Sequence, residues 1–190
     1  MFAPVLALAG ACQGGGTSSS AGTGTGTGTD TDTSGTETGT PAGPMQLVRA
    51  DAWVAVEELA DPLASHRPET VDCGLGGLFV EGEELEIDTN LCNYAMLEQP
   101  GLAAVPEGAT LTLAMRHFDL TAPEPAMAHI ALLLGDVIAW ERTLIIPGPA
   151  EVITVDFAAP VAFAKGGPVR FHLHNHGQNT WILTGVTVTP

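Results

Sequence analysis

Basic residues are scarce in this sequence. Its 190 residues include 6 lysines and arginines against 22 aspartates and glutamates, which gives a formal net charge of −16. Proteins that bind nucleic acid use cations to displace the counterions of the phosphates, and anionic membrane surfaces attract basic segments. The composition therefore argues against nucleic acid and against an anionic lipid surface as partners.

Long apolar runs and the usual catalytic motifs are also missing. No run approaches the roughly 18–20 residues of a membrane-spanning helix. Residues 45–190 hold one serine, Ser65, outside any Gly-X-Ser-X-Gly motif, and one lysine, Lys165, in a Gly-Gly-Pro turn. No glycine-rich phosphate loop precedes a helical pattern. We therefore expect no serine hydrolysis, Schiff-base chemistry or nucleotide binding, and we predict that the protein is not an enzyme.

The first twelve residues form a short apolar segment that ends in small side chains and a cysteine, as signal peptides do before their cleavage site. The run Ala9-Gly10-Ala11-Cys12 resembles the lipobox of bacterial lipoproteins. This resemblance implies that Cys12 is lipidated and anchors the protein to a membrane of the bacterial cell envelope. Gln13, which follows the cysteine, implies the outer membrane. A simple cleaved secretion signal is the alternative.

Residues 13–44 are a low-complexity segment rich in threonine and glycine, without any aromatic or large aliphatic residue. Such a segment cannot bury enough apolar surface to offset the entropy of ordering. The sequence therefore predicts a disordered linker between an N-terminal anchor and a folded domain.

Residues 45–190 have a β pattern throughout, in which short runs of Val, Ile, Leu and Thr are separated by Gly, Pro, Asn and Asp. The Leu134–Val137 segment, with Gly135, is typical of a two-residue hairpin turn. Many short strands at this spacing predict an all-β fold, an antiparallel β-sandwich or jelly roll. The expected strands are Gln46–Val56, Leu75–Val80, Glu84–Asp88, Tyr94–Gln99, Thr110–Phe118, Ala126–Leu134, Val137–Ile146, Val152–Phe157, Val169–His174 and Thr180–Val188.

The order of these features resembles the galactose-binding-like β-sandwich of many carbohydrate-binding modules. The likeness lies in a Gln-containing strand, Leu97–Gln99, then the turn Pro106-Glu107-Gly108, and a closing pair of strands joined by the turn Asn175-His176-Gly177. The resemblance implies the fold and no binding residues, because these families place them in variable loops.

Cys73 and Cys92 are the only cysteines of the folded part. In an exported protein an even pair indicates a disulfide rather than a metal site or a reactive thiol. We therefore predict that they are bonded to each other.

The histidines are candidate metal ligands. His172 and His174 lie two residues apart, on the same face of an expected strand, about 7 Å from each other. His117 and His129 would complete a site if their strands neighboured this one, and imidazoles suit copper or zinc. The alternative is that these histidines are polar strand-face residues hydrogen-bonded to their neighbours.

The segment Phe171-His172-Leu173-His174-X-X-Gly177-X-Asn179-Thr180 is similar to the copper-ligand strand of copper/zinc superoxide dismutases. This resemblance implies only that His172 and His174 bind copper. The later histidines and the zinc-binding aspartate of that family have no counterpart here.

Two further features each have two interpretations. The acidic run Glu81–Asp88 indicates either a structural calcium site or a solvated strand face. The three tryptophans of the folded part either stack on sugar rings or belong to the core, and they are Trp53, Trp140 and Trp181. The candidate ligand-binding residues are Trp140, Trp181, Asn175 and Asn179.

The sequence thus predicts a cell-surface lipoprotein with a non-catalytic binding or interaction β-sandwich. Its expected partner is a neutral glycan or another envelope protein, since the acidic surface disfavours anionic polysaccharides. No cofactor is expected in that case. The alternative is a copper- or zinc-binding sandwich that uses the strand histidines.

Overall fold

The computed structural model describes residues 43–190. The expectations on the lipobox, on Cys12 and on residues 13–42 lie outside this part of the chain. Within the described part, no helix is both long and apolar enough to cross a membrane.

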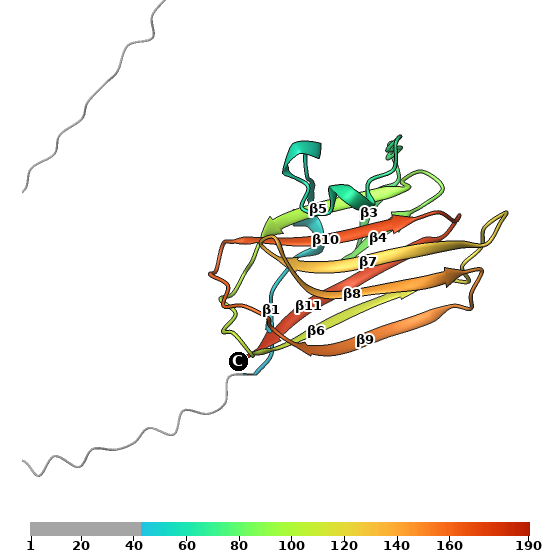
Figure 1. Cartoon of the computed structure of the whole chain (residues 1–190). Coiled ribbons are helices and arrows are strands. Elements are labelled where there is room, and N and C mark those ends of the chain that lie inside the picture. Colours follow the sequence, from blue (N-terminus) through green and yellow to red (C-terminus); the bar gives the residue numbers. More distant parts are fainter. Residues whose placement is uncertain (1–42) are drawn as a thin grey trace, which may run out of the picture. The chain divides into compact units, whose positions relative to one another are not determined.

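Two antiparallel sheets form the domain, as predicted for a β-sandwich (Figure 1). The first sheet has the strand order β3-β4-β11-β6-β9, and β1 also pairs with β11. Its strands are β1 (Met45–Gln46), β3 (Leu78–Glu81), β4 (Glu84–Asp88), β6 (Thr110–His117), β9 (Glu151–Ala158) and β11 (Thr180–Thr189).

The second sheet has the order β2-β5-β10-β7-β8. It contains β2 (Val54–Ala55), β5 (Tyr94–Pro100), β7 (Ala126–Leu134), β8 (Val137–Ile146) and β10 (Pro168–Asn175). The β7–β8 hairpin closes at Gly135, which has the positive φ of 62° expected for its turn. Strand β10 lies in the middle of this sheet and carries His172 and His174, so the fold puts both histidines between β5 and β7.

The core lies between the sheets and follows the two-residue period of the strands. On β10, Val169, Phe171 and Leu173 point into it, as their alternation predicts. Strand β4 alternates in the same way, with Leu85 and Ile87 inside. The alternate residues of β10, including His172 and His174, therefore belong to the outer face of the second sheet.

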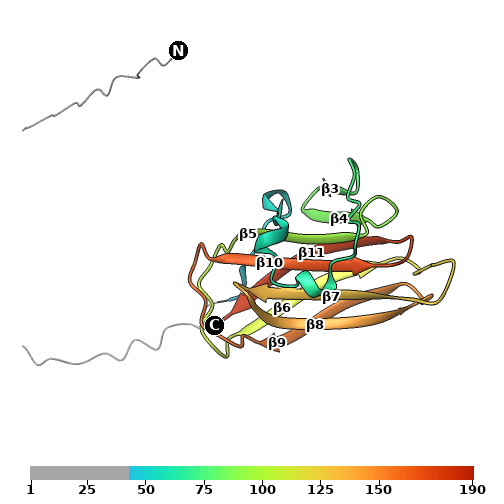
Figure 2. The same cartoon turned by 45° about the horizontal axis from the view of Figure 1, so that its top comes forward.

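That outer face is partly covered by residues 57–72, which we call the covering segment. It contains the 3-10 turns η2 (Glu58–Ala60) and η3 (Ala64–His66), which lie over the sheet of β5, β10 and β7 (Figure 2). A small second core joins it to the sheet and consists of Val56, Leu63, Val71, Tyr94, Met96, Ala131 and Leu133. The predicted disulfide between Cys73 and Cys92 is confirmed and fastens the end of the segment beside β5.

The strand expected over Gln46–Val56 was wrong. The chain pairs with β11 of the first sheet at β1, turns through η1 (Ala50–Ala52), and then pairs with β5 of the second sheet at β2. A continuous strand cannot make this crossing, because its two ends belong to different sheets.

Candidate metal centre

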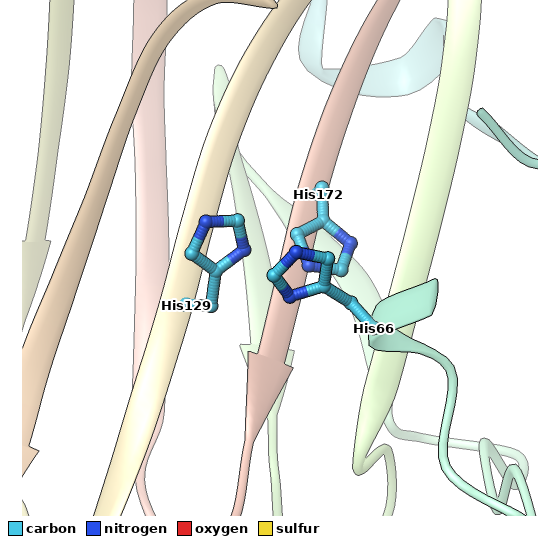
Figure 3. Close-up of side chains that lie close together, drawn as sticks. All are labelled: His66, His129 and His172. Carbon is cyan, nitrogen blue, oxygen red and sulfur yellow. The ribbon is translucent and has the colours of Figure 1, made fainter. Parts of the chain in front are cut away.

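Three histidines from three different elements meet on the outer face of the second sheet (Figure 3). His172 comes from the middle of β10, His129 from the neighbouring strand β7, and His66 from η3 of the covering segment. Each of the three rings offers one nitrogen, and these three nitrogens all lie within 4.8 Å of one another. In tetrahedral zinc sites with Zn–N bonds near 2.05 Å, the nitrogens are about 3.3 Å apart. Small side-chain rotations would therefore bring these nitrogens to ligand distances.

The rings contact one another directly. His66 stacks on His129 with a centroid distance of 4.1 Å, and its edge lies 5.6 Å from His172. The centroids of His129 and His172 are 5.2 Å apart. The three imidazoles therefore form one packed cluster.

His172 is the most deeply placed of the three, with 0% of its surface exposed. Neither of its ring nitrogens has a hydrogen-bond partner among the described residues. An imidazole that is buried with both nitrogens unpaired loses its hydration without compensation. An ion at the centre of the cluster would supply the missing interaction.

His129 has one paired and one unpaired nitrogen. Its Nε2 lies 3.2 Å from the carboxylate oxygen Oε2 of Glu141 on β8, whereas its buried Nδ1 has no partner within the described part of the chain. A carboxylate that accepts from one nitrogen fixes the tautomer and leaves the lone pair on the other. With Glu141 accepting from Nε2, Nδ1 of His129 would keep a lone pair that could bind an ion.

Burial favours the uncharged form of His172 and of His66. Burial, followed by the neighbouring His129, His66 and His174, lowers the pKa of His172 to about 3. Burial and His129 also lower the pKa of His66. Neutral imidazoles are the form that binds metals, because protonation removes the lone pair. His172 and His66 are therefore neutral at neutral pH and could each offer a lone pair to a metal ion.

The sequence identified two members of this cluster and missed the third. His172 and His129 were candidates, and the condition that their strands be neighbours is met by the β7–β10 pairing. His66 was not a candidate, because a single histidine in a 3-10 turn carries no spacing signal. Only the packing of the covering segment on the sheet brings it to the other two.

His174 and His117, the other two metal candidates, lie elsewhere. His174 is directly opposite His129 in the β7–β10 register, and its ring contacts Tyr94 and His176 instead of the centre of the cluster. His117 is buried in the first sheet against Trp181, where its Nδ1 contacts the carbonyl oxygen of Phe118. His117 could join His172 and His174 only if its strand neighboured β10, and β6 belongs to the other sheet.

The four residues that the sequence suggested as glycan-binding expose little surface to solvent. Trp181 is 1% exposed and belongs to the core, and the half-buried Trp140 packs near Phe157. Asn175 and Asn179 are buried, where they hydrogen-bond Thr89 and hold the β10–β11 turn. These four residues have structural positions in the fold.

In the acidic run, Glu84 forms an ion pair with Arg116 on β6, and Asp88 accepts hydrogen bonds from Asn90. Within residues 43–190, no three acidic side chains come close enough together to share an ion. A structural calcium site stays a prediction from the sequence.

Comparisons with known proteins give similarities of fold. No protein-family model matches the chain, and no curated protein matches it. Among solved structures, a protein described as "CBM4 structure and function" is 12% identical with a TM-score of 0.41, covering 75% of this chain and 96% of its own.

The N-terminal cellulose-binding domain of a Cellulomonas fimi β-1,4-glucanase is 14% identical with a TM-score of 0.40, covering 63% of this chain and 88% of its own. The C-terminal CBM6 of a laminarinase from Zobellia galactanivorans is 14% identical with a TM-score of 0.34, covering 63% and 97%. The fold assignment rests on the strand pairing given above, and these similarities assign no ligand to the chain.

Proposed function

We propose that the protein binds a zinc or copper ion through His66, His129 and His172. The observation that carries the proposal is the burial of His172 with both ring nitrogens unpaired, between two further imidazoles. Imidazole nitrogens are preferred ligands of both metals. The prepared lone pair on Nδ1 of His129 supports the same chemistry.

The ion would link three parts of the fold. Two ligands lie on adjacent strands of a rigid sheet, and the third lies on the covering segment. Metal binding would therefore fasten η3 to the sheet and stabilise the folded state by mass action. Three protein ligands leave a fourth tetrahedral position for water or for a donor from a partner.

Zinc titration of the full chain, purified without a histidine tag, tests the proposal. Competition with a chromophoric chelator should give one tightly bound zinc per chain. His66→Ala should weaken this binding at least 100-fold, because it removes one of three ligands. Ser65→Ala is the matched control, since Ser65 is exposed in the same turn and should leave the affinity unchanged.

X-ray absorption of the zinc-loaded protein gives a second readout, in which imidazole scattering should dominate. Absence of zinc and Cu²⁺ binding below about 10 μM, or equal affinities of His66→Ala and the wild type, would overturn the proposal.

Binding of a neutral glycan is the second candidate function, and a cavity of about 340 Å³ favours it. One wall is the half-buried ring of Trp53, and polar side chains of Arg49, Asp51, Glu83 and Thr184 line the rest. An aromatic face beside a few polar groups suits a sugar ring. The bulge of β11 between Leu183 and Gly185 lies in the lining of this cavity.

A screen of neutral oligosaccharides, followed by calorimetry, tests this second function. Trp53→Ala should abolish binding of any glycan found, whereas Trp140→Phe should not, because Trp140 on β8 does not line this cavity. A glycan whose affinity is unaffected by Trp53→Ala would exclude this cavity as its site.

We also propose that the protein is exported and lipidated at Cys12. The Cys73–Cys92 disulfide supports an oxidising compartment, where such bonds persist. Labelling with a radioactive fatty acid in a bacterial host should mark the wild type, and Cys12→Ala should lose the label. Secretion of an unlabelled wild-type chain would favour the simple signal peptide.

A further inference from the structure

Five of the six histidines of the chain gather on one face of the second sheet, and only three belong to the cluster described above. His174 lies next to His129 across the β7–β10 pair. Beyond it, the backbone amide of His176 donates a hydrogen bond of 3.4 Å to the carbonyl oxygen of Met127 on β7. From His172 through His174 to His176, the histidines of β10 and of the turn after it become progressively more exposed to solvent.

Met127 belongs to the same face. Side chains two residues apart on a strand point to the same side, so Met127 accompanies His129 on the outer face of β7. Met127 is 58% exposed, although methionine is usually buried as core filling. Met127 and His176 line one hollow, together with Glu124, Ile145 and two prolines. The exposed Met127 and His176 therefore share one hollow at the end of β7.

The two outer histidines contact each other. The centroids of the His174 and His176 rings are 4.3 Å apart with an interplanar angle of 50°. His174 is half-buried and His176 is exposed, so the pair is reachable from solvent at the edge of the hollow. His176 thus links His174, which its ring contacts, to the hollow that Met127 lines.

We infer that His174, His176 and Met127 form a second metal position, which takes Cu(I). Thioether ligands are soft and select Cu(I), whereas zinc in proteins is bound by thiolate, imidazole and carboxylate. The outer position therefore differs in ligand type from the three-histidine cluster. The inference goes beyond the proposed function and does not require it, because the two positions share no ligand.

Anaerobic titration of the full chain with Cu(I), against a colorimetric Cu(I) chelator, tests this position. Met127→Leu nearly keeps the volume and the apolar character of the side chain and removes the sulfur. We expect it to weaken Cu(I) binding at the outer position at least 10-fold and to leave zinc affinity unchanged. Ile145→Leu is the matched control, because Ile145 lines the same hollow without a ligand atom, and it should bind Cu(I) as the wild type does.

The His66→Ala background isolates the outer position from the inner cluster. In that background one Cu(I) should still bind, and adding His176→Gln should remove it. Copper X-ray absorption should show sulfur scattering in the His66→Ala protein and none after Met127→Leu is added.

Three results would overturn the inference: unchanged Cu(I) affinity in Met127→Leu, no copper–sulfur scattering, or complete loss of Cu(I) binding in His66→Ala alone. The last result would place the ion in the inner cluster, so the proposed function would stand while the outer position fails. Conversely, an outer Cu(I) site without zinc binding would leave this inference standing alone.

Discussion

The phenol of Tyr94 on β5 donates a hydrogen bond of 2.5 Å to the buried carboxylate of Asp61 in the covering segment. The same carboxylate accepts from the backbone amide of Leu63 at 2.8 Å and from Arg67 at 3.1 Å. A buried carboxylate is stable when it is paired in this way. The hydrogen bond between Tyr94 and Asp61 thus fastens the covering segment, which carries His66, to the sheet that carries the other two histidines. The ring of Tyr94 also contacts His172.

Tyr94→Phe removes the phenol donor and retains the ring. We expect the free energy of unfolding to fall by about 1–3 kcal/mol, because a buried carboxylate loses one of its donors. Zinc affinity should fall as well, since the covering segment becomes less firmly placed. Urea unfolding and zinc titration measure the two effects. In a cycle with Asp61→Asn, additive losses would show that the two side chains do not act as a pair.

Glu141→Gln tests whether the carboxylate beside His129 prepares the ligand nitrogen. The amide is a weaker acceptor and does not impose one tautomer on the imidazole, so zinc affinity should fall about 10-fold. Glu98→Gln is a suitable control, because Glu98 is paired with Arg170 on the same sheet. Equal zinc affinities of the two variants would argue against a role for Glu141 in metal binding.

The disulfide should contribute to stability through the unfolded chain. Cys73 and Cys92 are 19 residues apart, and closing a loop of this length restricts the unfolded ensemble by about 3 kcal/mol. The double variant Cys73→Ser/Cys92→Ser should lose this amount in urea unfolding. Reduction of the wild type should reproduce the loss, and an unchanged midpoint in both experiments would contradict it.

The sandwich was predictable because strand alternation and turn residues are local signals. The Leu134–Val137 hairpin and the inward face of β10 follow from a few neighbouring residues each. The crossing between β1 and β2 was not predictable, because Gln46–Val56 has strand propensity at both ends and the change of sheet is a tertiary event. Propensity alone does not report which sheet a residue joins.

The candidate site was half predictable for the same reason. The two-residue spacing of His172 and His174 placed both on one strand face, but it did not say which would be buried. The covering segment decides this, since it lies over His172 and brings His66 to it. That contact joins residues about a hundred positions apart in the sequence, and no local pattern encodes it.

The lowered pKa values make the stability of the metal-free protein depend on pH. The pKa of His172 is about 3 when folded, against an ordinary value near 6.5, so below pH 6.5 the unfolded chain binds the extra proton. Stability from this group is therefore complete above pH 6.5 and is lost progressively as the pH falls toward 3. His174, whose pKa is lowered to about 4 chiefly by burial and then by His176, acts in the same direction.

Urea unfolding in the presence of a chelator, between pH 4.5 and 6, measures this dependence. One proton taken up on unfolding corresponds to about 1.4 kcal/mol per pH unit. His172→Gln should reduce the slope by about that amount, whatever its effect on stability at pH 7, because glutamine does not titrate. The carboxylates of the ion pairs, such as Glu84 with Arg116, also lose stability in acid, but they are common to both proteins and cancel in the difference. Equal slopes for the two proteins would mean that the imidazole of His172 is hydrated in solution and titrates like an exposed histidine.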